Sequence, residues 1–290
     1  MDDVSFNLKL KPLIPSTGGG LSGEAHLYEE RGEKRVVRVC NNEERAIFYE
    51  RLCIDLSKYK ILPKFIMRRG KYVFLEFLEG RDLGKNENLE VFKHIGRICA
   101  IINNLEINNT PVDINKDFFE RLDQLNTGNY PKYSKKEYEE KKRRRPNETH
   151  DIGKIVPLIS LEEKNRIINL NKKLMKKFKQ NVTLDTFDVS PANFRLSKGK
   201  VYFVDLDAIK PKLKGMGVIK CMFGWAEKEE EREALLSGYY SKYKGEKFSE
   251  EYQKLLELHF LIQALHDRAK LGRSYDKQLK KLKELMKINQ

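Results

Sequence analysis

Apolar residues change their spacing along the chain, from short strand-like runs to helix-like periodicity. Residues 36–40 and 71–78 are rich in β-branched and aromatic side chains, which is typical of strands. Between them, the apolar residues of segment 43–52 follow helical spacing. Helical patterns dominate after residue 90 and are interrupted by strand-like patterns at about 182–210. The pattern therefore predicts a β-rich amino-terminal segment of about 80 residues, followed by a mainly helical segment.

A group of short polar side chains stands inside the later strand-like region. Asp188 and Asn193 are flanked by apolar residues, and an apolar strand then ends at Asp205, with Asp207 two residues on. The sequence Ser-Lys-Gly-Lys at 197–200 is typical of a hairpin turn. This order of strands and turns brings Asp188, Asn193 and Asp205 near one another, and their oxygens are ligands that Mg²⁺ accepts. The structural alternative is an Asp and an Asn that only cap turns.

The motif resembles that of the protein-kinase-like superfamily, in the branch of aminoglycoside phosphotransferases, choline kinases and small archaeal kinases. That branch has H-G-D-x-x-x-x-N and then an apolar strand ending in D-x-D. This chain has Thr186-Phe187-Asp188 at the first three positions, so it departs at two of them. The resemblance implies that Asp188 is the catalytic base, that Asn193 and Asp205 hold Mg²⁺, and that Asp207 is a supporting carboxylate.

The resemblance extends to the amino-terminal segment. A glycine-rich turn at 16–23 precedes a short apolar stretch, and glycine lets backbone approach phosphates closely, although a flexible linker has the same composition. Arg38 stands in the strand position where the family has a phosphate-binding Lys, and Glu44 is the expected ion-pair partner. Backbone at 76–78 is similar to the family's adenine-binding connection. The residues implied to bind ATP are Gly18, Gly19, Gly20, Ser22, Arg38, Glu44, Glu76 and Leu78.

The fold expected from this resemblance is an α+β, two-lobed kinase-like fold. Residues 1–78 form the small β-rich lobe that binds nucleotide, and residues 79–290 form the larger, mainly helical lobe for catalysis and acceptor binding. ATP and Mg²⁺ are the implied cofactors.

Positive charge is the best indication of the acceptor. The chain carries 57 Lys+Arg against 43 Asp+Glu, a net charge of +14. Residues 132–145 contain eight basic and three acidic residues, and further lysines crowd the segments 172–179 and 277–287. Such patches attract polyanions, and RNA offers ribose 2′-hydroxyls. The combination resembles the archaeal tRNA kinases. The expected RNA contacts are Lys141, Lys142, Arg143, Arg144, Arg145, Lys172 and Lys176.

Three other functions remain open. A small-molecule kinase of the aminoglycoside or choline type has the same motifs, but a strongly basic protein repels cationic acceptors. A protein kinase is disfavoured because no A-P-E-type segment follows Asp205. Substitution of Arg38 for Lys leaves open a catalytically inactive, RNA-binding relative of the kinases.

Localisation is indicated by what the sequence lacks. No apolar run approaches 18 residues, and the opening Met-Asp-Asp has no secretory signal pattern. Four scattered cysteines and five histidines form no zinc-binding spacing, and the cysteines are expected to be reduced core thiols. We therefore expect a cytoplasmic protein without a membrane partner, and the sequence does not indicate an oligomeric state.

Overall fold

The computed structural model describes residues 11–12, 25–105, 113–130, 156–178, 182–186 and 188–287. The chain divides into two compact units. Unit 1 comprises Met1–Leu105, Thr186–Lys210 and Lys220–Lys244, and unit 2 comprises Glu106–Asp185, Pro211–Ile219 and Gly245–Gln290. The predicted α+β order of a sheet followed by helices is confirmed, whereas the lobe boundary after residue 78 stays a prediction.

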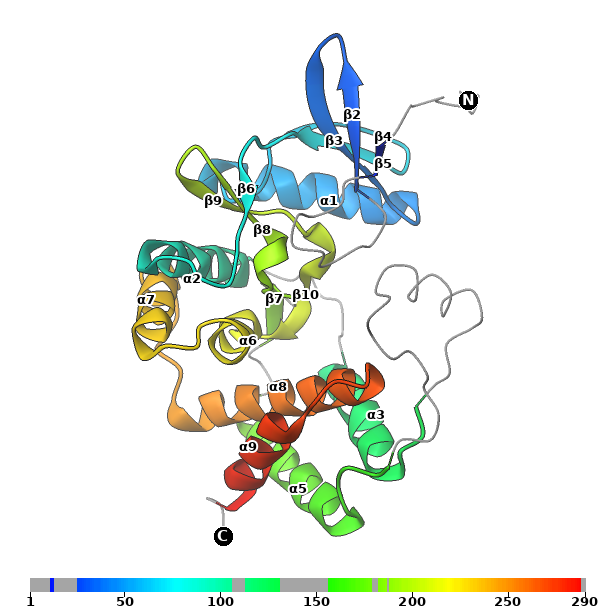
Figure 1. Cartoon of the computed structure of the whole chain (residues 1–290), viewed down its shortest axis with the longest axis vertical. Helices are drawn as coiled ribbons and strands as arrows, with labels where there is room; N and C mark the ends of the chain where they lie inside the picture. The colour runs from blue at the N-terminus through cyan, green and yellow to red at the C-terminus, as the bar shows by residue number, and fades with distance from the viewer. Residues whose placement is uncertain are drawn as a thin grey trace. The chain divides into compact units, whose positions relative to one another are not determined.

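Unit 1 is built on a five-stranded antiparallel sheet with strand order β1-β2-β3-β5-β4 (Figure 1). The predicted strands at 36–40 and 71–78 are its central strands β3 and β5, whose buried apolar residues Val37, Val73, Phe74 and Leu75 belong to the core. Helix α1 packs against β4 and β5. The elements are β1 (Lys11–Pro12), β2 (Ala25–Glu30), β3 (Glu33–Val39), α1 (Glu43–Leu56), the short 3-10 helix Ser57–Tyr59, β4 (Phe65–Arg69) and β5 (Tyr72–Glu76).

A three-stranded sheet with order β6-β8-β9 carries the polar motif. β8 and β9 pair from Phe194 opposite Phe203 to Ser197 opposite Lys200. The two residues between them have positive φ, 49° at Lys198 and 75° at Gly199, so the predicted hairpin turn is confirmed. The bounds are β6 (Arg81–Asp82), the 3-10 helix Pro191–Asn193, β8 (Phe194–Ser197), β9 (Lys200–Phe203) and the 3-10 helix Leu206–Ala208.

Helices α2 (Leu89–Asn103) and α7 (Glu229–Tyr240) lie side by side in unit 1. Glycines allow their backbones to approach closely. A Cβ atom added at Gly96 would lie 2.0 Å from the carbonyl oxygen of Leu235, and one added at Gly238 would lie 2.0 Å from that of Lys93. Because both obstacles are backbone atoms, neither site has room for a larger residue.

Replacing Gly96 by Ala is therefore expected to destabilise the protein. Alanine improves helix propensity by about 1 kcal/mol, but overpacking against a backbone costs about 1–3 kcal/mol or more. A lower midpoint in urea unfolding checks the expectation. Gly224→Ala is the matched control, since nothing lies within 4 Å of its Cβ position. Equal midpoints for the two variants would contradict this account of the α2–α7 contact.

Unit 2 is mainly helical. Helix α8 (Glu250–Lys270) packs against α3 (Ile114–Thr127), α5 (Leu161–Phe178) and α9 (Asp276–Lys287). Within the described ranges, no helix is both long enough and apolar enough to span a membrane. Three further elements contain residues of both units: β7 (Val182–Thr186), which pairs with β10 (Ile209–Leu213), and α6 (Met216–Gly224).

Candidate nucleotide and phosphoryl-transfer site

The β8–β9 hairpin brings Asn193 next to Asp205. Since Phe194 pairs with Phe203, the residues just outside this pair meet at the open end of the hairpin, where the Val204 N–H donates to the Asn193 carbonyl oxygen at 2.9 Å. Asp205 then caps the following turn, and its Oδ1 accepts from the Asp207 N–H at 3.2 Å. The expected approach of Asn193 and Asp205 is thus present in the structure.

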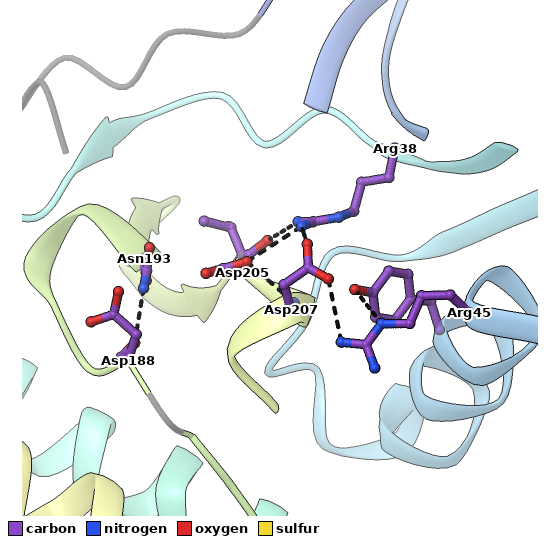
Figure 2. A network of polar contacts seen from close by, with 8 residues as sticks. Arg38, Arg45, Asp188, Asn193, Asp205 and Asp207 are labelled. Carbon is purple, nitrogen blue, oxygen red and sulfur yellow. Dashed lines mark hydrogen bonds and ion pairs between the residues drawn. The ribbon is translucent and has the colours of Figure 1, made fainter. Parts of the chain in front are cut away.

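Asp188 lies at the other side of Asn193 (Figure 2). The Asn193 side-chain Nδ2 donates to the backbone carbonyl of Asp188 at 2.8 Å. This bond fixes the amide so that its oxygen is turned away from that carbonyl, while the exposed Asp188 carboxylate stays accessible. A buried amide oxygen acceptor and a solvent-accessible carboxylate therefore stand on one loop.

Thr186, where the family has His, anchors the start of this loop. It is fully buried at the end of β7, and its hydroxyl lies 3.4 Å from the Cys99 sulfur in α2. Cys99 is one of four free cysteines, all buried, as predicted. The contact ties the segment before Asp188 to a core helix.

Arg38 reaches the two aspartates from β3. Its side chain is only 5% exposed, and its Nη2 lies 3.3 Å from Asp205 Oδ1 and in contact with Asp207 Oδ2. Its Nη1 donates to the Val204 carbonyl oxygen at 3.3 Å. A buried cation requires such counter-charges. Burial also raises the pKa of the nearby Cys53 thiol to about 12, although the Arg38 charge acts in the opposite direction.

The expected ion pair between Arg38 and Glu44 is not formed. Glu44 is exposed, and the helix residue that joins the cluster is Arg45, whose Nη2 lies 3.3 Å from Asp207 Oδ1. The reason is helical periodicity. Arg45 lies four and seven residues before the buried Tyr49 and Leu52, on the same side of the helix, whereas Glu44 is exposed.

Sequence reasoning missed Arg45, although its signal was present. The spacing i, i+4, i+7 from position 45 already marks the face that is buried in α1. The resemblance to the family instead predicted an acidic partner for Arg38 at the start of the helix. Glu43 pairs with Arg68 at 2.8 Å and thus does not replace Glu44 in the cluster.

The cluster fits a Mg²⁺ ion that is shared with nucleotide phosphates. Asn193 Oδ1 and the Asp205 carboxylate supply oxygen donors from adjoining strand ends, while both Asp207 oxygens contact arginines. Within the described ranges, no three His, Cys, Asp or Glu side chains form a metal-binding group. Mg²⁺ is commonly held by one or two carboxylates plus phosphates, so a larger protein cage is not required.

The connection that was predicted to meet adenine is fastened to β8. Arg195 donates to the carbonyl oxygens of Leu78 at 2.7 Å and Gly80 at 2.8 Å, and it pairs with Asp82 at 2.7 Å. The Glu76 N–H donates to the Lys64 carbonyl oxygen at 2.9 Å. Several backbone groups of this connection therefore already have partners, and adenine contacts at Glu76 and Leu78 stay a prediction.

Trp225 belongs to the core, as predicted, and not to an aromatic cage. It is 5% exposed, with ring centroids 5.3 Å from Phe92 and 6.0 Å from Phe194. Its indole N–H donates to the Lys85 carbonyl oxygen at 3.2 Å.

Of the predicted RNA contacts, Lys172 and Lys176 are described, and both are exposed on α5 in unit 2. Other predicted site residues lie outside the described residues. The predicted positions without a described structure are Gly18, Gly19, Gly20, Ser22, Lys141, Lys142, Arg143, Arg144 and Arg145.

Comparison with known proteins shows the same architecture at low sequence identity. A choline kinase from Streptococcus pneumoniae matches with a TM-score of 0.60 at 12% identity, over 97% of this chain and 94% of that one. An aminoglycoside phosphotransferase from Alicyclobacillus acidocaldarius matches with a TM-score of 0.59 at 12% identity, over 96% and 94%. An ethanolamine kinase from Plasmodium vivax matches with a TM-score of 0.55 at 12% identity, over 97% and 81%.

Sequence comparison adds no narrower relationship, since no protein-family model and no curated protein matches this chain. The structural similarity spans nearly the whole of both chains. The chain therefore has the protein-kinase-like fold that choline kinases and aminoglycoside phosphotransferases share.

Proposed function

We propose that this protein is an ATP-dependent phosphotransferase that moves the γ-phosphate to a hydroxyl group. The observation that carries the proposal is the meeting of Asn193, Asp205 and Arg38 at the open end of the β8–β9 hairpin. Two oxygen donors beside a buried guanidinium suit a metal-bound polyphosphate. Among proteins with this fold, one choline kinase structure is a complex with AMP and one spectinomycin phosphotransferase structure contains ADP.

Each residue of the cluster has a distinct role in this proposal. The accessible Asp188 carboxylate orients the acceptor hydroxyl and takes up its proton. Asn193 and Asp205 would hold Mg²⁺, which supplies charge neutralisation at the phosphates. Arg38 binds phosphate oxygens in place of the usual Lys, and its planar guanidinium suits bidentate contacts. Catalysis then rests on positioning and electrostatic stabilisation, without a covalent enzyme intermediate.

We further propose that the acceptor is RNA, most simply a ribose 2′-hydroxyl of tRNA. The net charge of +14 favours a polyanionic acceptor over a cationic one. In unit 2, Lys172 and Lys176 are exposed on α5, and neither forms an ion pair with another described residue. Exposed lysines without counter-charges suit phosphate contacts along a nucleic acid.

A small-molecule acceptor is the second candidate. It is favoured by the fold, because the matching structures include a choline kinase, an ethanolamine kinase and a spectinomycin phosphotransferase. It is disfavoured by charge, and burial of Trp225 removes the chain's one tryptophan from any cage for a quaternary ammonium group.

One transfer assay separates these candidates. The protein is incubated with Mg²⁺ and ATP labelled at the γ-phosphate, in parallel with total tRNA, choline, ethanolamine and aminoglycosides. Label that enters tRNA supports the proposal, and label that enters a small alcohol supports the second candidate. Salt-sensitive binding of tRNA without transfer to any acceptor would indicate a catalytically inactive RNA-binding protein.

Neutralising the two exposed lysines of α5 is expected to weaken tRNA binding. Each lost phosphate contact reduces the slope of log affinity against log salt by about 1, so Lys172→Gln with Lys176→Gln should reduce it by about 2. Exchange of Arg143, Arg144 and Arg145 for Gln should act in the same direction. Binding titrations of labelled tRNA at several salt concentrations provide the measurement.

The matched control is Lys58→Gln with Lys60→Gln, which removes two exposed lysines from unit 1. An equal loss of affinity in this control would mean that only total charge matters. Unchanged affinity in the α5 variant would show that this helix does not contact RNA.

A further inference from the structure

Two arginines share one carboxylate in unit 1. Asp207 contacts Arg38 through Oδ2 and Arg45 through Oδ1, the latter at 3.3 Å, so it stands between cations from β3 and α1 (Figure 2). With Asp205, the cluster contains two positive and two negative side chains and is neutral overall. If Asp205 bound Mg²⁺ and Asp207 released the arginines, both guanidinium groups would require another anion.

The Arg45 side chain is already held in place for such an anion. Its Nε donates to the Tyr49 hydroxyl at 2.9 Å, and its guanidinium lies over the rings of Tyr49, at 4.7 Å, and Phe48, at 5.2 Å. These contacts involve Nε and the flat face of the Arg45 guanidinium group. An oriented guanidinium loses less conformational freedom when it binds an anion.

The surroundings of Arg45 leave room for a ligand. A cavity of about 350 Å³ is bordered by Arg45 and Asp207, together with polar and apolar side chains of the β3–α1 connection and α1. The neighbouring Arg38 is 95% buried in its side chain, and its Nε has no hydrogen-bond acceptor among the described residues. The cavity therefore adjoins Arg45 and Asp207, and Asp207 also contacts the buried Arg38. The other lining residues are Cys40, Asn41, Asn42, Glu44 and Phe48.

We propose that Arg45 is a second phosphate-binding residue for the nucleotide, and that it selects nucleotides with more than one phosphate. Arg38 binds the inner part of the phosphate chain, and Arg45 binds an outer phosphate in place of Asp207. Asp207 is the anion that holds both arginines until the nucleotide binds. The inference rests on the proposed function. It assigns the role of α1 at this site to the cation Arg45, where Glu44 was expected as an acidic partner of Arg38.

The test compares nucleotide affinities and does not depend on the acceptor. Calorimetric titrations measure binding of Mg-ATP, Mg-ADP, AMP and adenosine to the wild type and to Arg45→Gln. Loss of one charge-assisted phosphate contact should weaken Mg-ATP binding by about 10- to 100-fold. Binding of AMP and adenosine should change by only a few fold. Arg45→Lys should recover part of the Mg-ATP affinity, because it restores the positive charge without the paired N–H donors of the guanidinium group.

Arg51→Gln is the matched control, since it makes the same exchange at an exposed position of the same helix and should leave all four affinities unchanged. Wild-type affinity for Mg-ATP in Arg45→Gln would overturn the inference. An equal loss for Mg-ATP and adenosine would also overturn it, because Arg45 would then act through the fold. If the wild type itself failed to bind Mg-ATP, the proposed function would be contradicted as well, so the two failures are distinguishable.

Discussion

Exchange of Asp188 for Asn is expected to reduce phosphate transfer by about 10²- to 10⁴-fold, the usual contribution of a general base. The affinity for Mg-ATP should remain close to that of the wild type. The physical reason lies in the loop geometry, since Asn193 bonds to the backbone carbonyl of Asp188 and not to its carboxylate. The substitution therefore removes a charge from an exposed side chain without breaking the contact that orients Asn193. The measurement consists of initial rates of phosphate transfer, with the acceptor identified in the transfer assay described above, together with Mg-ATP titrations.

Asp55→Asn is a suitable comparison, because Asp55 is an exposed aspartate of unit 1 that lies on α1. It should transfer phosphate at the wild-type rate. Full turnover by the Asp188 variant would refute the role of this residue as the base. A loss of Mg-ATP binding in parallel with turnover would instead assign Asp188 to the nucleotide site.

Exchange of Asp205 for Asn should impair both binding and turnover. If Asp205 holds Mg²⁺ as proposed, its loss removes several kcal/mol of charge stabilisation, so transfer is expected to fall by about 10²- to 10³-fold. The substitution also removes one of the two carboxylates beside Arg38, although Asp207 remains. The specific readout is the ratio of ATP affinities with Mg²⁺ and with a chelator, which should be large in the wild type and close to one in the variant.

The two variants thus have different expected signatures. Asp188→Asn separates transfer from nucleotide binding, whereas Asp205→Asn affects both. An Asp205 variant that keeps the full gain in ATP affinity from Mg²⁺ would exclude this residue as a metal ligand. Thermal unfolding of both proteins checks that the fold is retained.

The hairpin that forms the site could be predicted from the sequence because its determinants are local. The Lys198-Gly199 turn sets the register of β8 and β9, and the register alone brings Asn193 to Val204 and Asp205. The predicted central strands β3 and β5 were likewise readable from their β-branched and aromatic residues.

The partners of Arg38 could not be predicted in the same way. They come from residues more than 160 positions away in the sequence, and a family pattern suggested a different carboxylate. The close contact of α2 and α7 was also missed, because Gly96 and Gly238 have no side chains that contribute to hydrophobic periodicity. Tertiary contacts of this kind depend on which elements meet, and local patterns do not encode that.

Arg38, Arg45, Asp205 and Asp207 belong to unit 1, whereas the exposed lysines of α5 belong to unit 2. Under the proposed function, this distribution separates the residues for phosphate transfer from those for acceptor binding. Substitutions in α5 are therefore expected to change acceptor affinity and to leave the contacts of Arg38 with Asp205 and Asp207 in place.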